Sequence, residues 1–159
     1  MIEMLLHAQQ RTADYGGRLT ADLTPEQAVA QPAAAVNHAA WVLSHLNAYL
    51  PVMAALIRGD EFPDPKDHEF GMKSKPLADA SLYAPISELR TTFLEGNQAA
   101  ADALREAGPD CLDRDMTLER WKTIMPKTGI ALSYLMLAHQ NLHLGQLSAW
   151  RRVQGLPSV

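Results

Sequence analysis

The fold is decided by an uncharged run near the C-terminal end of the chain, residues 128–150, TGIALSYLMLAHQNLHLGQLSAW. A second uncharged run, residues 33–57, reads AAAVNHAAWVLSHLNAYLPVMAALI, and neither run contains an Asp, Glu, Lys or Arg. A helix without charges has no face suited to water, so each run is expected to be a buried core helix. The sequence therefore predicts an all-α protein built around two internal helices.

Each run is also long enough to cross a lipid bilayer. The runs nevertheless carry strong hydrogen-bonding groups, such as Asn37 and His45 in the first and Gln140 and His143 in the second. These groups are costly in lipid, which favours core helices over membrane spans. The N-terminus lacks the basic and apolar regions of a signal peptide, so we expect a cytoplasmic protein without a membrane partner.

Two more helices are expected on either side of the first uncharged one. Residues 2–16 and residues 85–107 both carry apolar side chains at helical spacing, and Gly108 and Pro109 end the second of these segments. The uncharged helices themselves are expected to cover about 35–58 and 128–154. Together these four segments predict a four-helix bundle.

The connections between the helices are unequal in length. Residues 24–27, TPEQ, have the pattern of a capping box that starts a short helix. Residues 59–84 are rich in proline, charge and turn residues, and a connection this long usually has a purpose. We interpret it as a crossover that makes the second and third long helices parallel. Residues 110–126 are a second irregular stretch, and we expect residues 1–159 to form a single domain.

The charged residues and the single cysteine exclude several classes of function. The chain has 14 Lys and Arg against 18 Asp and Glu, a net charge of −4, with no basic cluster. Nucleic acid is therefore not expected as a partner, because affinity for phosphate backbones rests on clustered Lys and Arg. Cys111 is the only cysteine, so neither an intrachain disulfide nor a multi-thiolate metal site is expected. Its acidic neighbours disfavour a thiolate, and we interpret it as a packing residue.

Histidines are the main candidates for chemistry. His139 and His143 are four residues apart, so both side chains lie on one face of a helix and can reach one ion. His38 and His45 are seven apart, about two turns, so only one of them can complete the same site. Such spacing also arises by chance, and a lone histidine on an apolar face is more often a hydrogen-bonded core residue. Buried imidazoles, however, need partners for both nitrogens, and a shared cation provides them.

A three-histidine site would leave one or more coordination positions open, which is typical of catalytic rather than structural zinc. Imidazole nitrogens suit Zn, Ni, Cu or Fe, and the spacing does not choose among these metals. Zn or Ni is the preferred prediction for the divalent metal.

Two segments also carry a resemblance to a known family. Residues 37–46, NHAAWVLSHL, resemble the second-helix signature of the DinB-like family. Residues 138–147, AHQNLHLGQL, continuing to an Arg-Arg pair and a Gly-Leu-Pro triplet, are similar to its fourth-helix signature. The resemblance extends over the helix order and the long second connection. It implies that the metal ligands are His45, His139 and His143, and it offers no ligand counterpart for His38.

Four residues are candidates for the pocket beside the metal. His38 is assigned to the pocket or to contacts behind the ligands, and Trp41 falls between His38 and His45 on the same face. Tyr49 lies one turn beyond His45, and Gln146 follows His143 on nearly the same face. Each has an ordinary alternative, since an aromatic at this spacing is more often core and a glutamine often binds nearby backbone.

Two further residues carry expectations about packing. Asn97 interrupts the apolar stripe of the third long helix, and a surface-leaning side chain is slightly favoured over one that points into the pocket. Gly145 lies within the last helix, where glycine costs about 1 kcal/mol relative to alanine, and this suggests the close approach of a neighbouring helix.

The resemblance implies enzymes that activate a low-molecular-weight thiol for transfer to an electrophile, and thiol-dependent isomerases. We therefore expect a metal-dependent enzyme acting on a small molecule, S-transferase-like or hydrolase-type, that uses a low-molecular-weight thiol as cofactor. The alternative is a non-catalytic metal- or ligand-binding bundle whose histidines are structural or regulatory. A helical interaction module is disfavoured because the uncharged helices are expected to be internal. A homodimer is also expected, since small bundles often pair helix faces.

Overall fold

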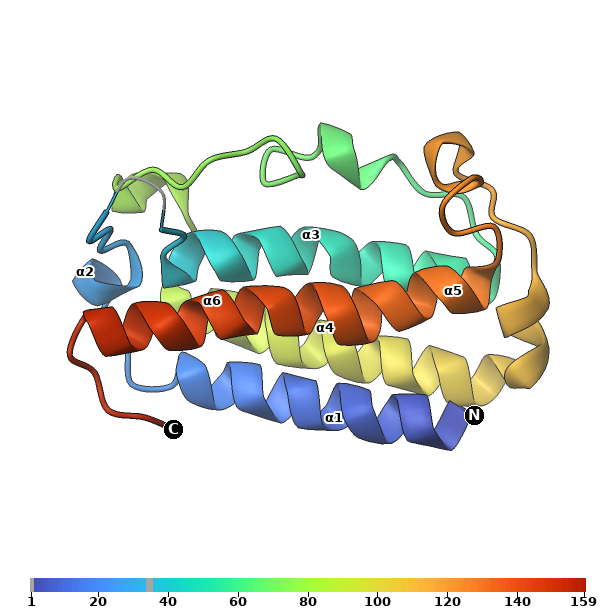
Figure 1. Cartoon of the computed structure of the whole chain (residues 1–159), viewed down its shortest axis with the longest axis horizontal. Coiled ribbons are helices and arrows are strands. Elements are labelled where there is room, and N and C mark those ends of the chain that lie inside the picture. The colour runs from blue at the N-terminus through green and yellow to red at the C-terminus, as the bar shows by residue number, and fades with distance from the viewer. Residues whose placement is uncertain (1, 34–35) are drawn as a thin grey trace.

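A computed structural model describes residues 2–33 and 36–159, and all the regular elements within this part of the chain are helices. Four long helices lie side by side as a bundle (Figure 1). The first three are α1 (Ile2–Leu19), α3 (Ala39–Arg58) and α4 (Ile86–Ala107). The fourth helix is continuous but has three parts, α5 (Thr128–Ser133), the π-helical turn η5 (Tyr134–His139) and α6 (Gln140–Val153). The predicted all-α four-helix bundle is confirmed.

The crossover, residues 59–84, returns along the outside of α3, so that α3 and α4 run in the same direction (Figure 1). It contains only two short 3-10 turns, η1 (Pro65–Asp67) and η2 (Ala80–Leu82). The predicted capping box is present at α2 (Pro25–Ala28), where the Thr24 hydroxyl accepts a hydrogen bond from the Gln27 N–H. The last connection contains the 3-10 turns η3 (Pro109–Asp113) and η4 (Glu119–Trp121).

The start of α3 differs from the expectation. The expected first residue, Ala35, lies outside the described residues, but residues 36–38 are described and are not helical. Helix α3 begins at Ala39, and His38 is its N-cap, because the His38 Nδ1 accepts a hydrogen bond from the Trp41 N–H at 3.2 Å. An N-cap side chain that satisfies a free backbone N–H is a start signal that apolar periodicity does not reveal.

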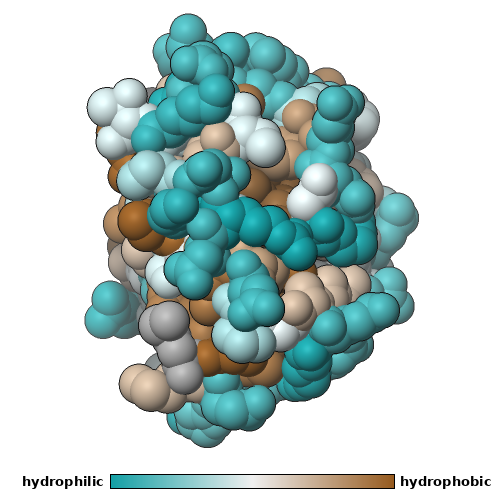
Figure 2. Space-filling model, turned by 90° about the vertical axis from the view of Figure 1, so that its right-hand side faces the viewer, coloured by the Kyte–Doolittle hydropathy of each residue, from teal (hydrophilic) through white to brown (hydrophobic). Residues whose placement is uncertain are grey.

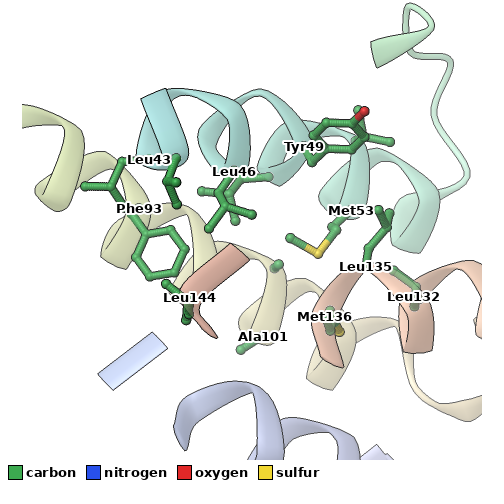
Figure 3. Packing of buried hydrophobic residues seen from close by; sticks show 14 of the residues in the cluster. Leu43, Leu46, Tyr49, Met53, Phe93, Ala101, Leu132, Leu135, Met136 and Leu144 are labelled. Carbon is green, nitrogen blue, oxygen red and sulfur yellow. The ribbon is translucent and has the colours of Figure 1, made fainter. Parts of the chain in front are cut away.

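The core fills the space between the four helices. Figure 3 shows side chains of α3, α4 and the fourth helix meeting there, with Phe93 between Leu43 and Leu144. Helix α3 is long and apolar enough to cross a membrane, but 83% of its most apolar window is buried inside the bundle. It is therefore packed as the core helix that the sequence predicted.

The fourth helix is less internal than its uncharged sequence suggested. Ile130, Tyr134 and Leu142 are respectively 47%, 45% and 59% exposed. A helix at the corner of a four-helix bundle keeps one face in contact with solvent, and here that face is uncharged. An interaction surface was disfavoured because both uncharged helices were expected to be internal. That reason holds for α3 but not for this face of the fourth helix.

The end of the bundle near the N-terminus is mostly hydrophilic on its outside, with hydrophobic side chains visible in the hollows between (Figure 2). The opposite end is tied together by Arg151, which is 2% exposed. Its guanidinium donates hydrogen bonds to the Leu19 and Pro157 carbonyls and binds both carboxylate oxygens of Asp22. This arginine of the quoted fourth-helix signature therefore has a structural role, since it joins the end of α1 to the end of the chain.

The expectation for Gly145 was wrong. It lies on an exposed face of α6, and a Cβ added there would meet nothing within 4 Å. Close approaches occur instead at Gly16, where a Cβ would lie 2.5 Å from the Phe93 ring, and at Gly96, where it would lie 2.5 Å from Leu50. A glycine in a helix therefore did not by itself reveal which face meets a neighbour.

The preferred position for Asn97 was also wrong, because its residue is 3% exposed and not at the surface. Its side chain lies between helices α1, α4 and α6, where its Oδ1 accepts hydrogen bonds from Gln9 and Gln140. We call these three residues the amide cluster. A polar residue interrupting an apolar stripe can stay buried when its hydrogen bonds are made by other buried side chains.

Candidate metal centre

Three histidines meet between α3 and the fourth helix. His45 comes from α3, His139 is the last residue of the π-helical turn, and His143 lies one turn further along α6. One nitrogen of each imidazole lies within 4.8 Å of the nitrogens of the other two, and the Nε2 atoms of His45 and His139 are 3.1 Å apart. All three residues are buried, with exposed fractions of 4%, 8% and 9%. We call these residues the histidine cluster.

The π-helical turn directly precedes the two histidines of the fourth helix. A π-turn places an extra residue in one helical turn and thereby changes which face the following residues present. Such turns are frequent at functional sites. In this chain the turn Tyr134–His139 sets the angle at which His139 and His143 leave the helix. The regular four-residue spacing from His139 to His143 then holds within α6.

The crossover fixes the orientation of His45. Its Nδ1 lies 2.6 Å from the backbone carbonyl oxygen of Phe70, which can only accept a hydrogen bond. The proton of a neutral His45 is therefore assigned to Nδ1, and the lone pair of Nε2 faces the other histidines. A carbonyl behind a histidine ligand fixes the ring and raises its basicity. This contact is a typical second partner for a metal ligand.

His143 is held in a similar way from the other side. Its Nδ1 lies 3.1 Å from Oε1 of Gln146, and the same oxygen accepts a hydrogen bond from the Asn37 side chain at 3.1 Å. This pair of contacts assigns the Gln146 oxygen as the acceptor and the His143 proton to Nδ1. The Nε2 of His143 is again left free to face the cluster.

His139 differs from the other two because its Nδ1 is buried and has no hydrogen-bond partner among the described residues. Its Nε2 is 3.1 Å from the Nε2 of His45, whose proton is already on the opposite nitrogen. Two ligand nitrogens of a tetrahedral zinc site lie about 3.3 Å apart when each bond is 2.0–2.1 Å long. The spacing of these two nitrogens and the donor set of three imidazoles therefore fit a divalent cation such as zinc.

Burial keeps the cluster uncharged. It lowers the pKa of His45 to about 4, an effect that the Phe70 carbonyl opposes in part. Burial also lowers the pKa of His139 to about 3, with the other two histidines adding to the effect, and it lowers the pKa of His143. Neutral imidazoles have the lone pairs that a metal ion needs, so the cluster is ready to bind at neutral pH without first losing protons.

The cluster forms part of the wall of a cleft of about 570 Å³. The Trp41 ring stacks on His45 at 4.9 Å between centroids, and the Tyr49 ring lies 4.7 Å from His139. The remaining walls come from the crossover, the last connection and the fourth helix. The lining residues are Trp41, His45, Tyr49, Met72, Arg120, Trp121, Ile124, Met125, Tyr134, Leu135, His139, Leu142 and His143. Three protein nitrogens beside an accessible cleft leave room for a small molecule at the same ion.

The four pocket candidates fall into two groups. Trp41 and Tyr49 line the cleft. Gln146 contacts His143 from behind and is exposed, outside the lining of the cleft. His38 is also outside that lining, where its Nε2 contacts the Leu77 carbonyl at 3.0 Å and its Nδ1 caps α3. Its contacts are therefore those of a residue that joins the crossover to the start of the helix.

Sequence reasoning missed the residues that the connections supply. The Phe70 carbonyl, Met72 and Arg120 come from irregular segments, where no periodicity indicates which side chain or carbonyl turns inward. The unusual length of the crossover was the one signal for its role. It predicted that the segment had a purpose but not which atoms would serve it.

Comparison with known proteins agrees with the geometry. No curated protein matches the sequence. A sequence model of the DinB superfamily matches residues 8–147, a range that contains most of α1, all of α3 and α4, most of the fourth helix and all three clustered histidines. A match over this share of the residues establishes the family. The chain therefore belongs to the DinB superfamily.

Proposed function

We propose that this protein is a metal-dependent enzyme that transfers a low-molecular-weight thiol to a small electrophile, with His45, His139 and His143 as the metal ligands. The observation that carries the proposal is the convergence of three buried, neutral imidazoles on the wall of an open cleft. A purely structural site would be closed by protein ligands, whereas three ligands beside a cleft are typical of a catalytic one.

The chemistry follows from the charge of the ligands. A divalent cation held by these three neutral imidazoles would keep its full charge, and it would supply the means to lower the pKa of a nearby thiol. The protein residues then orient the reactants. The Phe70 carbonyl holds His45, Gln146 holds His143, and the Trp41 ring forms a flat wall over His45.

Tyr49 is the candidate hydrogen-bond donor within the cleft. Burial raises the pKa of its phenol, with the acidic Asp64 and Tyr134 adding to the effect and Arg120 opposing it, so the hydroxyl keeps its proton at neutral pH. A protonated phenol beside the cluster can donate a hydrogen bond to an electrophile that gains negative charge during attack. Tyr49 belongs to the buried core, and Figure 3 shows its side chain on α3 with the hydroxyl oxygen pointing away from the other labelled side chains.

The thiol must come from outside the chain. Cys111 is 0% exposed, does not line the cleft, and has a pKa that burial raises. A buried, protonated thiol is a poor nucleophile. This favours an external thiol as the nucleophile over a covalent intermediate on the protein.

The test combines metal analysis with a thiol screen. Protein purified without an affinity tag is analysed for metal, and the metal-loaded form is assayed with several thiols and the chromogenic electrophile 1-chloro-2,4-dinitrobenzene. We expect about one divalent ion per chain and a thiol-dependent rate. His143→Ala should remove both. His7→Ala, a substitution of an exposed histidine on α1, is the matched control and should leave both unchanged. Bound metal without a thiol-dependent rate would favour a non-catalytic metal-binding bundle instead.

A further inference from the structure

Exposed apolar side chains gather around the mouth of the cleft. Met72, Ile124, Tyr134 and Leu142 are 60%, 67%, 45% and 59% exposed, and all four line the cleft. They come from the crossover, the last connection and the fourth helix. Exposed apolar residues that converge from separate segments on one cleft are typical of a binding site. We call these four residues the rim.

Arg120 is the one charged side chain among the residues that line the cleft. It is held by Asp64, which lies outside that lining. The Asp64 carboxylate accepts hydrogen bonds from Nε and Nη2 of the guanidinium at 2.6–2.9 Å. The face of the guanidinium lies 5.0 Å from the centre of the Trp121 ring. This two-pronged ion pair fixes the arginine in one orientation.

One edge of the guanidinium remains available. The ion pair uses Nε and Nη2, and no residue in the described part of the chain binds Nη1. The side chain of Arg120 is 29% exposed while that of Asp64 is 13% exposed. A fixed arginine with a free N–H edge is suited to bind a carboxylate or sulfonate, because its planar donors match the oxygens of these groups.

We propose that the cleft binds a small organic anion, with its carboxylate or sulfonate on the Nη1 edge of Arg120 and its apolar body against the rim. The proposal rests on the proposed function, because it names the class of electrophile that would reach the histidine cluster. The Nη1 of Arg120 has N–H donors and no lone pair, so it can bind the oxygens of an anion and makes no hydrogen bond to a cationic head group. A neutral molecule of the same shape would contact the rim but would make no ion pair.

A matched pair of fluorescent dyes tests the proposal. 8-Anilinonaphthalene-1-sulfonate carries an apolar body and one sulfonate, and N-phenyl-1-naphthylamine has the same body without the charge. We expect Arg120→Gln to raise the Kd of the sulfonate dye about tenfold, the loss of one charge-assisted contact. The Kd of the neutral dye should change less than about twofold. An unchanged Kd for the sulfonate dye, or an equal loss for both dyes, would overturn the proposal.

Arg105→Gln is the control for charge, since Arg105 is an exposed arginine of α4 that pairs with Asp102 away from the cleft. It should leave both affinities unchanged. Because Arg120→Gln removes the arginine partner of Asp64 and leaves it with Lys66 alone, the double variant Asp64→Asn/Arg120→Gln is measured as well. It replaces the ion pair by two neutral amides and should show the same selective loss of the sulfonate dye. Thermal unfolding of each variant verifies that the dyes bind folded protein.

The rim has its own test. Ile124→Ser should weaken both dyes, whereas Leu82→Ser, at a residue 49% exposed outside the cleft, should weaken neither. Sedimentation is measured for the same variants. If Ile124→Ser dissociates a dimer and leaves both dye affinities unchanged, the rim is a contact between two copies of the chain and the proposal is overturned.

The dye test and the proposed function can fail independently, because dye binding requires neither a metal nor turnover. A selective effect of Arg120→Gln without any thiol-dependent rate would support the anion site and contradict the transferase. A thiol-dependent rate with no selective effect of Arg120→Gln would support the transferase and contradict the anion site.

Discussion

Two clusters of buried polar side chains in the bundle, the amide cluster and the histidine cluster, differ in how their nitrogens are satisfied. In the amide cluster, the amide nitrogens of Gln9, Asn97 and Gln140 all donate to carbonyl oxygens inside the protein. In the histidine cluster, the lone pair of the His45 Nε2 faces the Nε2 of His139 at 3.1 Å. The first arrangement needs nothing from outside for its donors, whereas the second brings three imidazoles together in an arrangement that fits a divalent cation.

The two clusters adjoin at one point in the sequence. His139 and Gln140 are adjacent residues at the end of the π-helical turn, and a step of about 100° between them turns one side chain to each cluster. Only the histidine cluster lines the 570 Å³ cleft. Burial of polar groups alone therefore does not indicate a functional site. Gln9 and Asn97 of the amide cluster line a smaller cleft of about 310 Å³. Imidazole nitrogens that face one another, and not a cleft by itself, therefore distinguish the histidine cluster.

The largest expected effect separates the clusters by metal content. His143→Ala should abolish stoichiometric metal while far-UV circular dichroism stays nearly unchanged, because a four-helix core does not depend on one ion. His38→Ala should retain the metal, since His38 lies outside the lining of the cleft. Metal analysis by mass spectrometry measures both. Loss of metal in His38→Ala with retention in His45→Ala would contradict the choice of ligand on α3.

A substitution in the amide cluster should lower stability and leave the metal content unchanged. Asn97→Ala removes the oxygen that accepts from both glutamines and leaves two buried amide groups without that partner, so we expect a loss of about 2–4 kcal/mol in the free energy of unfolding. Chemical denaturation measures the loss, and metal content should stay at the wild-type ratio. If Asn97→Ala lost the metal without losing stability, the two clusters would not be separate.

A moderate loss of metal affinity is expected when a residue that contacts a ligand histidine is replaced. Gln146→Ala removes the oxygen that binds the His143 Nδ1, and substitutions at such positions typically weaken metal affinity 10–100-fold. Competition with a chromogenic chelator measures the change, which we expect near the lower limit because Gln146 is exposed. Gln154→Ala, at a glutamine that instead contacts the Ala30 carbonyl, is the control and should have no effect. Equal affinities for the two variants would assign no role to the Gln146 contact.

The smallest expected effect is an increase in stability. Gly145→Ala adds a methyl group where nothing lies within 4 Å, so it should raise the free energy of unfolding by about 0.5–1 kcal/mol through helix propensity alone. Gly16→Ala is the contrasting variant and should destabilise, because its Cβ would lie 2.5 Å from the Phe93 ring. Thermal unfolding compares the two. A loss of metal in Gly145→Ala would show that the site extends over this face of α6.

The sequence predicted those parts of the molecule that rest on periodic patterns. The four helices and the face shared by His139 and His143 follow from spacing along a helix, and the crossover follows from the composition and length of residues 59–84. The choice of His45 over His38 came from the family resemblance. In the structure His38 caps α3 and His45 lies with the other two histidines, and the choice of ligand stays a prediction.

The remaining features depend on contacts between distant segments. The π-helical turn has no sequence signature that sets it apart from an ordinary helix, so the angle of His139 was not predictable. Asn97 was misplaced because its partners, Gln9 and Gln140, come from two other helices. Arg120 gains its role only through Asp64, 56 residues earlier in the chain. Single-sequence patterns do not contain such pairings.

The hydrogen bond from His45 to the Phe70 carbonyl has a consequence for anyone who would simplify this scaffold. One simplification would replace the crossover by a short turn, since the helices alone bring the three imidazoles together. The shortened protein would lose the Phe70 carbonyl that assigns the His45 proton to Nδ1. It would also lose the Ser74 hydroxyl, which accepts a hydrogen bond from the Trp41 indole N–H at 3.1 Å. His45 would then interchange between two tautomers, and only one of them presents the lone pair of Nε2. The crossover is therefore part of the minimal unit that must be transplanted with the site.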